Sequence, residues 1–353
     1  MAAFTAIDDA GSYYNTTLYD GTGASNAITG VGFAPDMVWV KNLASTTNQV
    51  IFDTVRGTTK SWYANETDVE VTDANGLTAF GADGFTVGSW VQSNTSGNDY
   101  ASWNWNMGTT TGISGSPSTT PTGYSFSAAA GQSIITYVGT SVAGGGPSAT
   151  LPHGLGKAPE FIMVKNLTQG ARDNNVYHEY IGNTHRLYLN QDAASIASSS
   201  AWDDTSPTST LFTVGGNEAT NELDKNFAAY CFTSIQGYSK FGDYIGNGDA
   251  DGQFINLGFR PAFLLIKRTD GVANWYMFDN KRLGYNIDNN ANRPDENWSR
   301  DTTDVLDLLS NGFKLRASSS SWNGSGDEYI YAAFADNPFV NSNGVPGTSR
   351  FQA

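Results

Sequence analysis

The 353-residue sequence predicts an all-β protein made of three tandem antiparallel β-sandwich modules. Aromatic residues make up 13% of the chain and charged residues 15%, and 39 glycines supply turns, a mixture that favours many short strands over helices. Three sequence landmarks each occur three times in the same order. A sustained 3.6-residue apolar period is absent from the sequence, and we expect one helical turn, at residues 304–309.

The first landmark is a Gly-x-x-Pro turn followed by an apolar run that ends in lysine. It reads GFAPDMVWVKN at 32–42, GKAPEFIMVKN at 156–166 and GFRPAFLLIKR at 258–268. Proline lacks an N–H group and fixes φ, so it suits the turn before a strand. Because the run is apolar on both faces, it predicts a central strand, and we expect Lys41, Lys165 and Lys267 to mark its exit to solvent.

The other two landmarks are a short strand and a closing aromatic strand. They read GFTVG (84–88), LFTVG (211–215) and GFKLR (312–316), then YASWNW (100–105), FAAYCF (227–232) and YIYAAF (329–334). The landmark prolines stand at 35, 159 and 261, steps of 124 and 102, and the closing strands begin 127 and 102 residues apart. This near-constant offset indicates a true repeat. Further short strands are expected at 49–53, 61–65, 85–88, 176–180, 187–190 and 212–215.

The landmarks divide the chain into modules. We expect sandwiches at 1–107, 124–235 and 236–340, with a C-terminal tail at 341–353. Residues 108–123 are rich in Gly, Ser, Thr and Pro, and predict a linker with nothing to pack. Glycines at 143–147 predict the end of a hairpin. The join at 233–238 is short, so the second and third modules should touch.

Charge and composition exclude several kinds of partner. A formal net charge of −15 provides no basic patch for nucleic acid and disfavours anionic membranes. No run of 18 apolar residues is present to insert into a membrane. The single cysteine, Cys231, excludes an intramolecular disulfide framework. The first eleven residues lack the pattern of a signal peptide, so we expect synthesis in a host cytoplasm.

Catalytic motifs are missing from the sequence. The three histidines, His153, His178 and His185, belong to no HExxH or His-x-His pattern and are expected to be satisfied residues at the surface or in turns. No Gly-x-Ser-x-Gly nucleophile turn occurs. We therefore expect no catalytic residue and no enzyme activity.

Sandwich folds also host glycosidases, which use a pair of carboxylates, and the sequence contains repeated acidic residues. Asp53 and Asp279 occupy matching places in the first and third copies, and Arg56 and Arg282 follow them by three residues. The second copy has Glu179 nearby without such an arginine. A catalytic residue would not normally be duplicated in two modules, so the pairs are interpreted as turn-stabilising.

A possible calcium loop occurs only in the third copy. Asn247, Asp249 and Asp251 alternate as in calcium loops, but the glutamate expected at the twelfth position is Gly258. A polar hairpin is favoured, with weak calcium binding as the alternative. No other cofactor is expected.

Six tryptophans lie outside the core landmarks, and loop tryptophans can stack on sugars or anchor an interface. The alternative is packing between modules or subunits. The candidates are Trp62, Trp90, Trp202, Trp275, Trp298 and Trp322.

The repeats resemble a module common in tailed bacteriophages of marine bacteria. The resemblance rests on the first landmark, on IFDTVRGTTK (51–60) and LTAFGADGFTVG (77–88), and on AYCFTSIQGYSKFG (229–242) and LLSNGFKLR (308–316). Proteins of that family are regarded as virion structural proteins, of tail, fibre or capsid-decoration type, with a jelly-roll or lectin-like sandwich. The resemblance therefore implies a virion location.

These observations favour a non-enzymatic virion structural protein, part of a tail, tail fibre or capsid decoration. The expected partners are sister subunits and other virion proteins, with homo-oligomerisation as a trimer if the protein forms a fibre. A carbohydrate-binding adhesin that meets a host surface glycan is the alternative. A polysaccharide-degrading enzyme is the third and weakest hypothesis, because only the fold class supports it.

Overall fold

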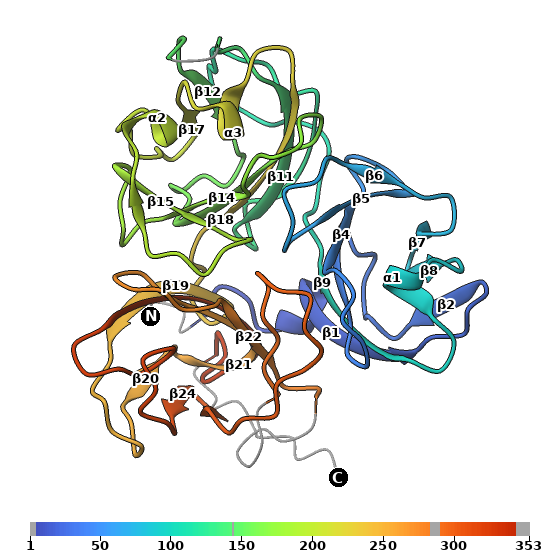
Figure 1. The fold of residues 1–353 in the computed structure, drawn as a ribbon, viewed down its shortest axis with the longest axis vertical. Coiled ribbons are helices and arrows are strands. Elements are labelled where there is room, and N and C mark those ends of the chain that lie inside the picture. Colours follow the sequence, from blue (N-terminus) through green and yellow to red (C-terminus); the bar gives the residue numbers. More distant parts are fainter. Residues whose placement is uncertain (1–4, 143–144, 283–289, 344–353) are drawn as a thin grey trace.

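The computed structural model describes residues 5–142, 145–282 and 290–343, and it confirms the all-β prediction. The strands form three groups around a common centre (Figure 1). Every pair of neighbouring strands in the six sheets is antiparallel (all six sheets lie within the described residues). The α-helices described in these ranges have four residues each, too few to cross a membrane.

The first module contains a six-stranded sheet, in the order β1-β9-β3-β4-β5-β6, and a three-stranded sheet, β2-β8-β7. Its elements are η1 (Ala10–Ser12), β1 (Tyr14–Asp20), β2 (Asn26–Thr29), β3 (Met37–Asn42), β4 (Val50–Asp53), β5 (Lys60–Tyr63), β6 (Val71–Thr72), β7 (Leu77–Gly81), β8 (Gly84–Val87), α1 (Val91–Asn94) and β9 (Asp99–Trp105).

The second module contains a seven-stranded sheet, β10-β11-β18-β13-β14-β15-β16, and a two-stranded sheet, β12-β17. Its elements are β10 (Gly123–Ser127), β11 (Gln132–Val138), β12 (Ala149–Pro152), β13 (Phe161–Asn166), β14 (Asn175–His178), β15 (His185–Tyr188), β16 (Ile196–Ala197), α2 (Ser199–Trp202), β17 (Leu211–Val214), α3 (Glu218–Asn221) and β18 (Asn226–Phe232).

The third module contains a four-stranded sheet, β19-β25-β21-β22, and a three-stranded sheet, β20-β24-β23. Its elements are β19 (Ser239–Ile245), β20 (Phe254–Asn256), β21 (Phe259–Arg268), β22 (Tyr276–Asp279), β23 (Leu306–Leu309), β24 (Gly312–Leu315) and β25 (Glu328–Pro338). In all three large sheets the closing strand (β9, β18 or β25) lies between the landmark strand (β3, β13 or β21) and an earlier strand of the same module (β1, β11 or β19). The repeat in sequence is thus a repeat in topology.

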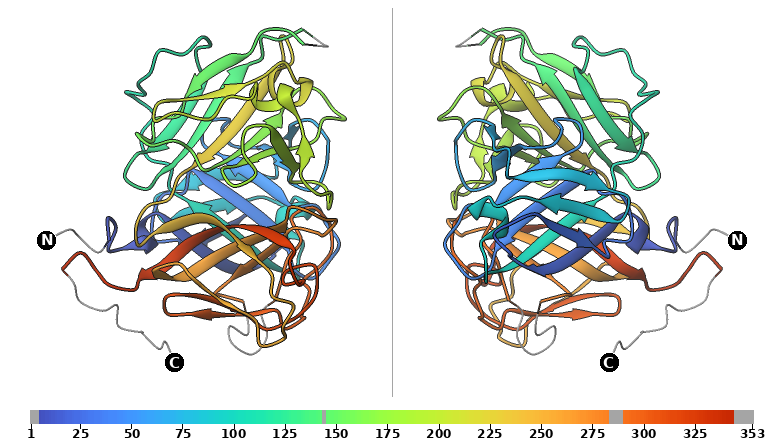
Figure 2. Two further views of the ribbon diagram at one scale, coloured as in Figure 1. Left: turned by 90° about the vertical axis from the view of Figure 1, so that its left-hand side faces the viewer. Right: turned by 90° about the vertical axis from the view of Figure 1, so that its right-hand side faces the viewer.

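The three tandem modules form a closed triangle (Figure 1). Figure 2 shows from the side that the second module (green to yellow) stands above the first (blue) and the third (orange to red). One face of each large sheet packs on the small sheet of its own module, and the other face packs on the neighbouring modules. This double burial explains why the landmark runs are apolar on both faces, as all six residues of β3 and of β13 are buried.

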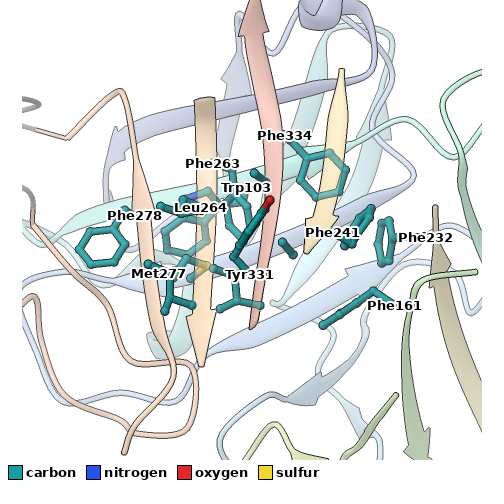
Figure 3. Packing of buried hydrophobic residues seen from close by; sticks show 14 of the residues in the cluster. Trp103, Phe161, Phe232, Phe241, Phe263, Leu264, Met277, Phe278, Tyr331 and Phe334 are labelled. Carbon is teal, nitrogen blue, oxygen red and sulfur yellow. The ribbon is translucent and has the colours of Figure 1, made fainter. Parts of the chain in front are cut away.

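Aromatic side chains fill the centre where the three large sheets meet (Figure 3). Trp105 of the first module and Phe232 of the second each pack against Phe334 of the third, with ring centroids 5.7 Å apart in both cases. The central space that remains is about 20 Å³, room for one water molecule at most. The expected contact between the second and third modules is therefore present, and the first module joins it.

Two local expectations were wrong. Residues 306–309 form β23, because Leu306 and Leu308 point into the core while the strand pairs with β24. The 108–123 segment is not free of packing: Ser118 exchanges hydrogen bonds with Thr150 of β12, and Ile113 packs on the core of the second module. The hairpin expected at 143–147 includes residues 143–144, which lie outside the described residues.

Candidate functional site

The three landmark lysines are buried, which corrects the expectation that they mark an exit to solvent. Lys41, Lys165 and Lys267 each have an exposed fraction of 0%. Each ammonium group donates hydrogen bonds to oxygen atoms instead of meeting water. Burial lowers the pKa of Lys41 to about 7 and the pKa values of Lys165 and Lys267 to about 8.

Each buried lysine joins its module to a different neighbour. Nζ of Lys41 lies 3.0 Å from the carbonyl oxygen of Asn297 in the third module. Nζ of Lys267 lies 2.9 Å from the carbonyl oxygen of Asp192 in the second module. Nζ of Lys165 lies 3.3 Å from the carbonyl oxygen of Glu66 in the first. The three bonds run first to third, third to second and second to first, so they close a ring.

The Asp–Arg pair of the first module also joins two modules. Asp53 accepts a hydrogen bond from the Arg56 backbone at 2.8 Å, which is the turn-stabilising role expected from the sequence. Its other oxygen accepts from the Arg56 guanidinium at 2.5 Å and from the Tyr230 hydroxyl of the second module at 2.7 Å. Because the Asp53 side chain is fully buried, these partners replace water.

The third module repeats this arrangement against the first. Asp279 accepts from the Arg282 guanidinium at 2.6 Å and from the indole nitrogen of Trp103 at 3.1 Å. Asp279 pairs with Phe263 on the landmark strand, as Asp53 pairs with Met37. The same registration assigns the equivalent place in the second module to His178, because His178 pairs with Phe161.

His178, and not Glu179, therefore takes the aspartate position in the second module. It is buried, its Nδ1 accepts the backbone N–H of Tyr180 at 3.1 Å, and its Nε2 lies 3.4 Å from the Tyr331 carbonyl oxygen of the third module. His153 is likewise buried and accepts the N–H of Leu155. Burial lowers the pKa values of both imidazoles to about 4, so they are neutral at pH 7. His185 is half-buried and contacts Thr184.

A third repeated polar residue escaped the sequence analysis. Asn94, Asn221 and Asn323 are fully buried, and the Oδ1 atom of each accepts a backbone N–H at 2.7–3.0 Å. Those N–H groups belong to the residues that follow Gly21, Gly139 and Gly246. The equal spacing from the closing strands could have revealed these asparagines, but a lone Asn in a loop is a weak signal.

Four of the six candidate tryptophans are buried, so they present no face to a glycan: Trp62, Trp202, Trp275 and Trp322. The indole nitrogen of Trp62 donates to the Tyr230 hydroxyl of the second module at 2.9 Å. That of Trp275 donates to the Tyr188 carbonyl oxygen, also in the second module, at 2.8 Å. The alternative of packing between modules therefore applies to these two.

The remaining two candidate tryptophans differ from each other. Trp90 is half-buried and stacks on Tyr63, with ring centroids 6.3 Å apart. Trp298 is 55% exposed, and the Arg293 guanidinium carbon lies 4.4 Å from its ring centroid. Trp298 alone among the six keeps an open aromatic surface.

The Asn247–Asp251 segment is not the expected hairpin: it is a loop that joins β19 of the four-stranded sheet to β20 of the three-stranded sheet, and its polar groups bind protein atoms. Asn247 Oδ1 accepts from the Asp249 backbone and the Asn323 amide, and the Asp249 carboxylate accepts from the Asp251 backbone. Asp251 pairs with Lys314 at 3.1 Å. Calcium binding stays a prediction, and an EDTA-induced fall in melting temperature would support it. Within residues 5–142, 145–282 and 290–343, no three His, Cys, Asp or Glu side chains converge as metal ligands would.

The second module carries two surface pockets that the sequence did not indicate. The first, of about 510 Å³, is lined by Glu160, Glu179, Tyr177 and Lys157 among others. Burial raises the pKa of Glu160, but this carboxylate is bound to the Ser234 N–H at 3.1 Å and to the Ser234 hydroxyl.

The repeat identifies Glu160 as a structural residue. The residue at its place in the first module is Asp36, because Asp36 and Glu160 both follow the landmark proline and donate a backbone N–H to the closing strand. The Asp36 carboxylate accepts the N–H groups of Met107 and Gly108, directly after that strand. Both carboxylates therefore hold the chain where it leaves the sheet.

The second pocket, of about 430 Å³, lies between β15, α3 and the loop before β14. Charged and polar groups dominate its wall, together with one tyrosine ring. Its wall includes Arg172, Asp173, Arg186, Tyr188, Asn217 and Glu218.

Comparison with known proteins places the chain in a family. A search of curated proteins found no significant match. The profile of the family described as "Domain of unknown function (DUF7483)" matches residues 9–338. This range contains every strand of the three modules described above. The chain therefore belongs to the DUF7483 family.

Proposed function

We propose that this chain is a non-enzymatic structural protein of a bacteriophage virion, in a tail, a tail fibre or a capsid decoration. It acts through protein–protein assembly and, at its outer surface, through host attachment. The sequence resemblance to phage modules suggests the location. The closed ring of buried bonds between modules supports the structural role.

The ring of bonds is the observation that carries this proposal. The residues that the repeats share, above all the three lysines and the two Asp–Arg pairs, are buried and bonded across module boundaries. Groups held in this way stabilise a fixed shape, because breaking one pair leaves a buried charge without its partner. A particle component needs such a shape to persist outside the cell.

Mass spectrometry of purified particles tests the location. The proposal expects peptides of this chain in stoichiometric amount, and density for a three-module body in a map of the particle. A chain absent from intact particles that the same genome encodes would contradict it. Sedimentation of the purified chain measures the expected homo-oligomer, and a monomer at micromolar concentration would contradict that part.

A further inference from the structure

The 430 Å³ pocket of the second module has a filled counterpart in the first module. Tyr188 pairs with Asn175 on β14, as Tyr63 pairs with Val50 on β4, so the two tyrosines occupy equivalent places. Asn217 precedes α3 as Trp90 precedes α1. The repeat therefore provides an internal control for what this place can hold.

In the first module, the indole of Trp90 occupies the space beside the tyrosine ring. Its ring stacks on Tyr63 at an interplanar angle of 27°, with centroids 6.3 Å apart. In the second module the tyrosine is kept as Tyr188, while the indole is replaced by the smaller Asn217 side chain. The pocket beside Tyr188 is thus the place where a six-membered ring packs in the first module.

The polar groups around this pocket are held in position. The Arg172 guanidinium pairs with Glu218 at 2.6 Å. The Asp173 carboxylate accepts from the amides of Asn190 and Gln191 at 2.9 and 2.6 Å. Such fixed donors and acceptors lose little freedom when a ligand binds.

Arg186 supplies a buried donor without a partner. Its guanidinium carbon lies 5.0 Å from the Tyr188 ring centroid, and its terminal nitrogen donates to the Asn175 amide oxygen at 3.3 Å. Its Nε atom is buried and has no hydrogen-bond partner among the described residues. Arg186 also lines the pocket, so its guanidinium group presents a positive charge and N–H donors to a ligand there.

We propose that this pocket binds a saccharide ring beside Tyr188. A pyranose has an apolar C–H face that packs on an aromatic ring, and its edge carries hydroxyl oxygens. One such oxygen, or the carboxylate of an acidic sugar, accepts from Arg186, while a hydroxyl donates to Asp173. The site is separate from the six tryptophans and goes beyond the structural role proposed above.

A glycan array of the full chain tests this site, with neutral and uronic-acid glycans as separate arms. The key variant is Asn217→Trp, which restores the tyrosine–tryptophan stack of the first module and fills the pocket. Asn217 caps α3 by accepting the Ala219 N–H at 2.9 Å, so the variant should lower the melting temperature slightly, but it should keep its fold because α1 forms behind Trp90 without a side-chain cap. Lys157→Ala, in the other pocket of the same module, is the matched control.

The wild type and Lys157→Ala should bind the same glycans, and Asn217→Trp should bind them at least tenfold more weakly while still unfolding in one cooperative transition. Arg186→Met, which removes the guanidinium group from the pocket wall, should also lose affinity, so the proposal stays testable if one variant misfolds. A wild type that binds no glycan at millimolar concentration would overturn the proposal, as would an Asn217→Trp variant of wild-type affinity. Glycan binding by a chain that is absent from particles would reject the virion role and keep this site. A chain that is present in particles but binds no glycan would reject this site and keep the virion role.

Discussion

Replacing Asp53 by Asn should destabilise the whole protein, because this carboxylate joins two modules in the absence of water. Asp53 is fully buried, and it neutralises Arg56 while accepting the hydroxyl of Tyr230. Breaking a buried ion pair costs about 3–5 kcal/mol. Arg56 keeps Glu70 as a second partner at 3.1 Å, so we expect a loss near the lower end, about 3 kcal/mol. Urea unfolding followed by tryptophan fluorescence measures this loss.

A double-mutant cycle isolates the part of this energy that crosses the module boundary. Tyr230→Phe alone removes the hydrogen bond to Asp53 and the one accepted from Trp62; its coupling with Asp53→Asn isolates the first of these and should be about 1–2 kcal/mol. Asp279→Asn is the matched control: it breaks the equivalent pair but shares no hydrogen-bond partner with Tyr230, so its effect should add to that of Tyr230→Phe within about 0.5 kcal/mol. A coupling near zero for Asp53 and Tyr230 would refute the assignment of this bond to the interface.

Three further predictions concern the same interior. Between pH 8 and pH 10, Lys165 binds fewer protons when folded than when unfolded, since its folded pKa is about 8 and its ordinary value 10.5, so stability rises with pH in this range. Wild type should therefore gain about 2–3 kcal/mol over Lys165→Met between these pH values, and parallel urea-unfolding profiles would contradict the burial of the ammonium group. Phe334→Ala removes a ring that contacts both other modules and should cost about 3–5 kcal/mol in the same assay, whereas a loss below about 1 kcal/mol would mean that the centre is not packed as described. Cys231 is fully buried and its thiol pKa is raised by burial, so it should react with a thiol reagent only on unfolding, and fast labelling of the native protein would show an open second module.

The sequence predicted the strands well, because their signals are local. Turn residues, apolar runs and the offset of the repeats locate the landmark strands of the first two copies within one or two residues of the observed bounds. In the third copy β21 begins at Phe259, before its landmark proline, and β25 continues to Pro338, beyond the predicted end at 334. The 304–309 segment was the exception: its leucines suggested a helical turn, but pairing with β24 decided for a strand. Local preference gave way there to tertiary pairing.

The partners of the polar residues could not be predicted from the sequence. A lysine that closes an apolar run usually marks an exit to solvent, and the acceptors that change this lie far along the chain, as Asn297 does for Lys41. Trp62 is covered by Tyr230 of another module in the same way. Trp90 and Asn217 can both be read in the sequence. That they occupy equivalent places became clear only from the strand register, which makes Tyr63 on β5 equivalent to Tyr188 on β15.

Differential scanning calorimetry of the full chain tests most directly whether the three modules form one interdependent body. The ring of lysine bonds and the shared aromatic centre predict a single transition, with a calorimetric enthalpy equal to the van't Hoff enthalpy. Asp53→Asn and Phe334→Ala should move this transition as a whole to lower temperature. Two or three separable transitions, with only one of them shifted by either substitution, would contradict the account.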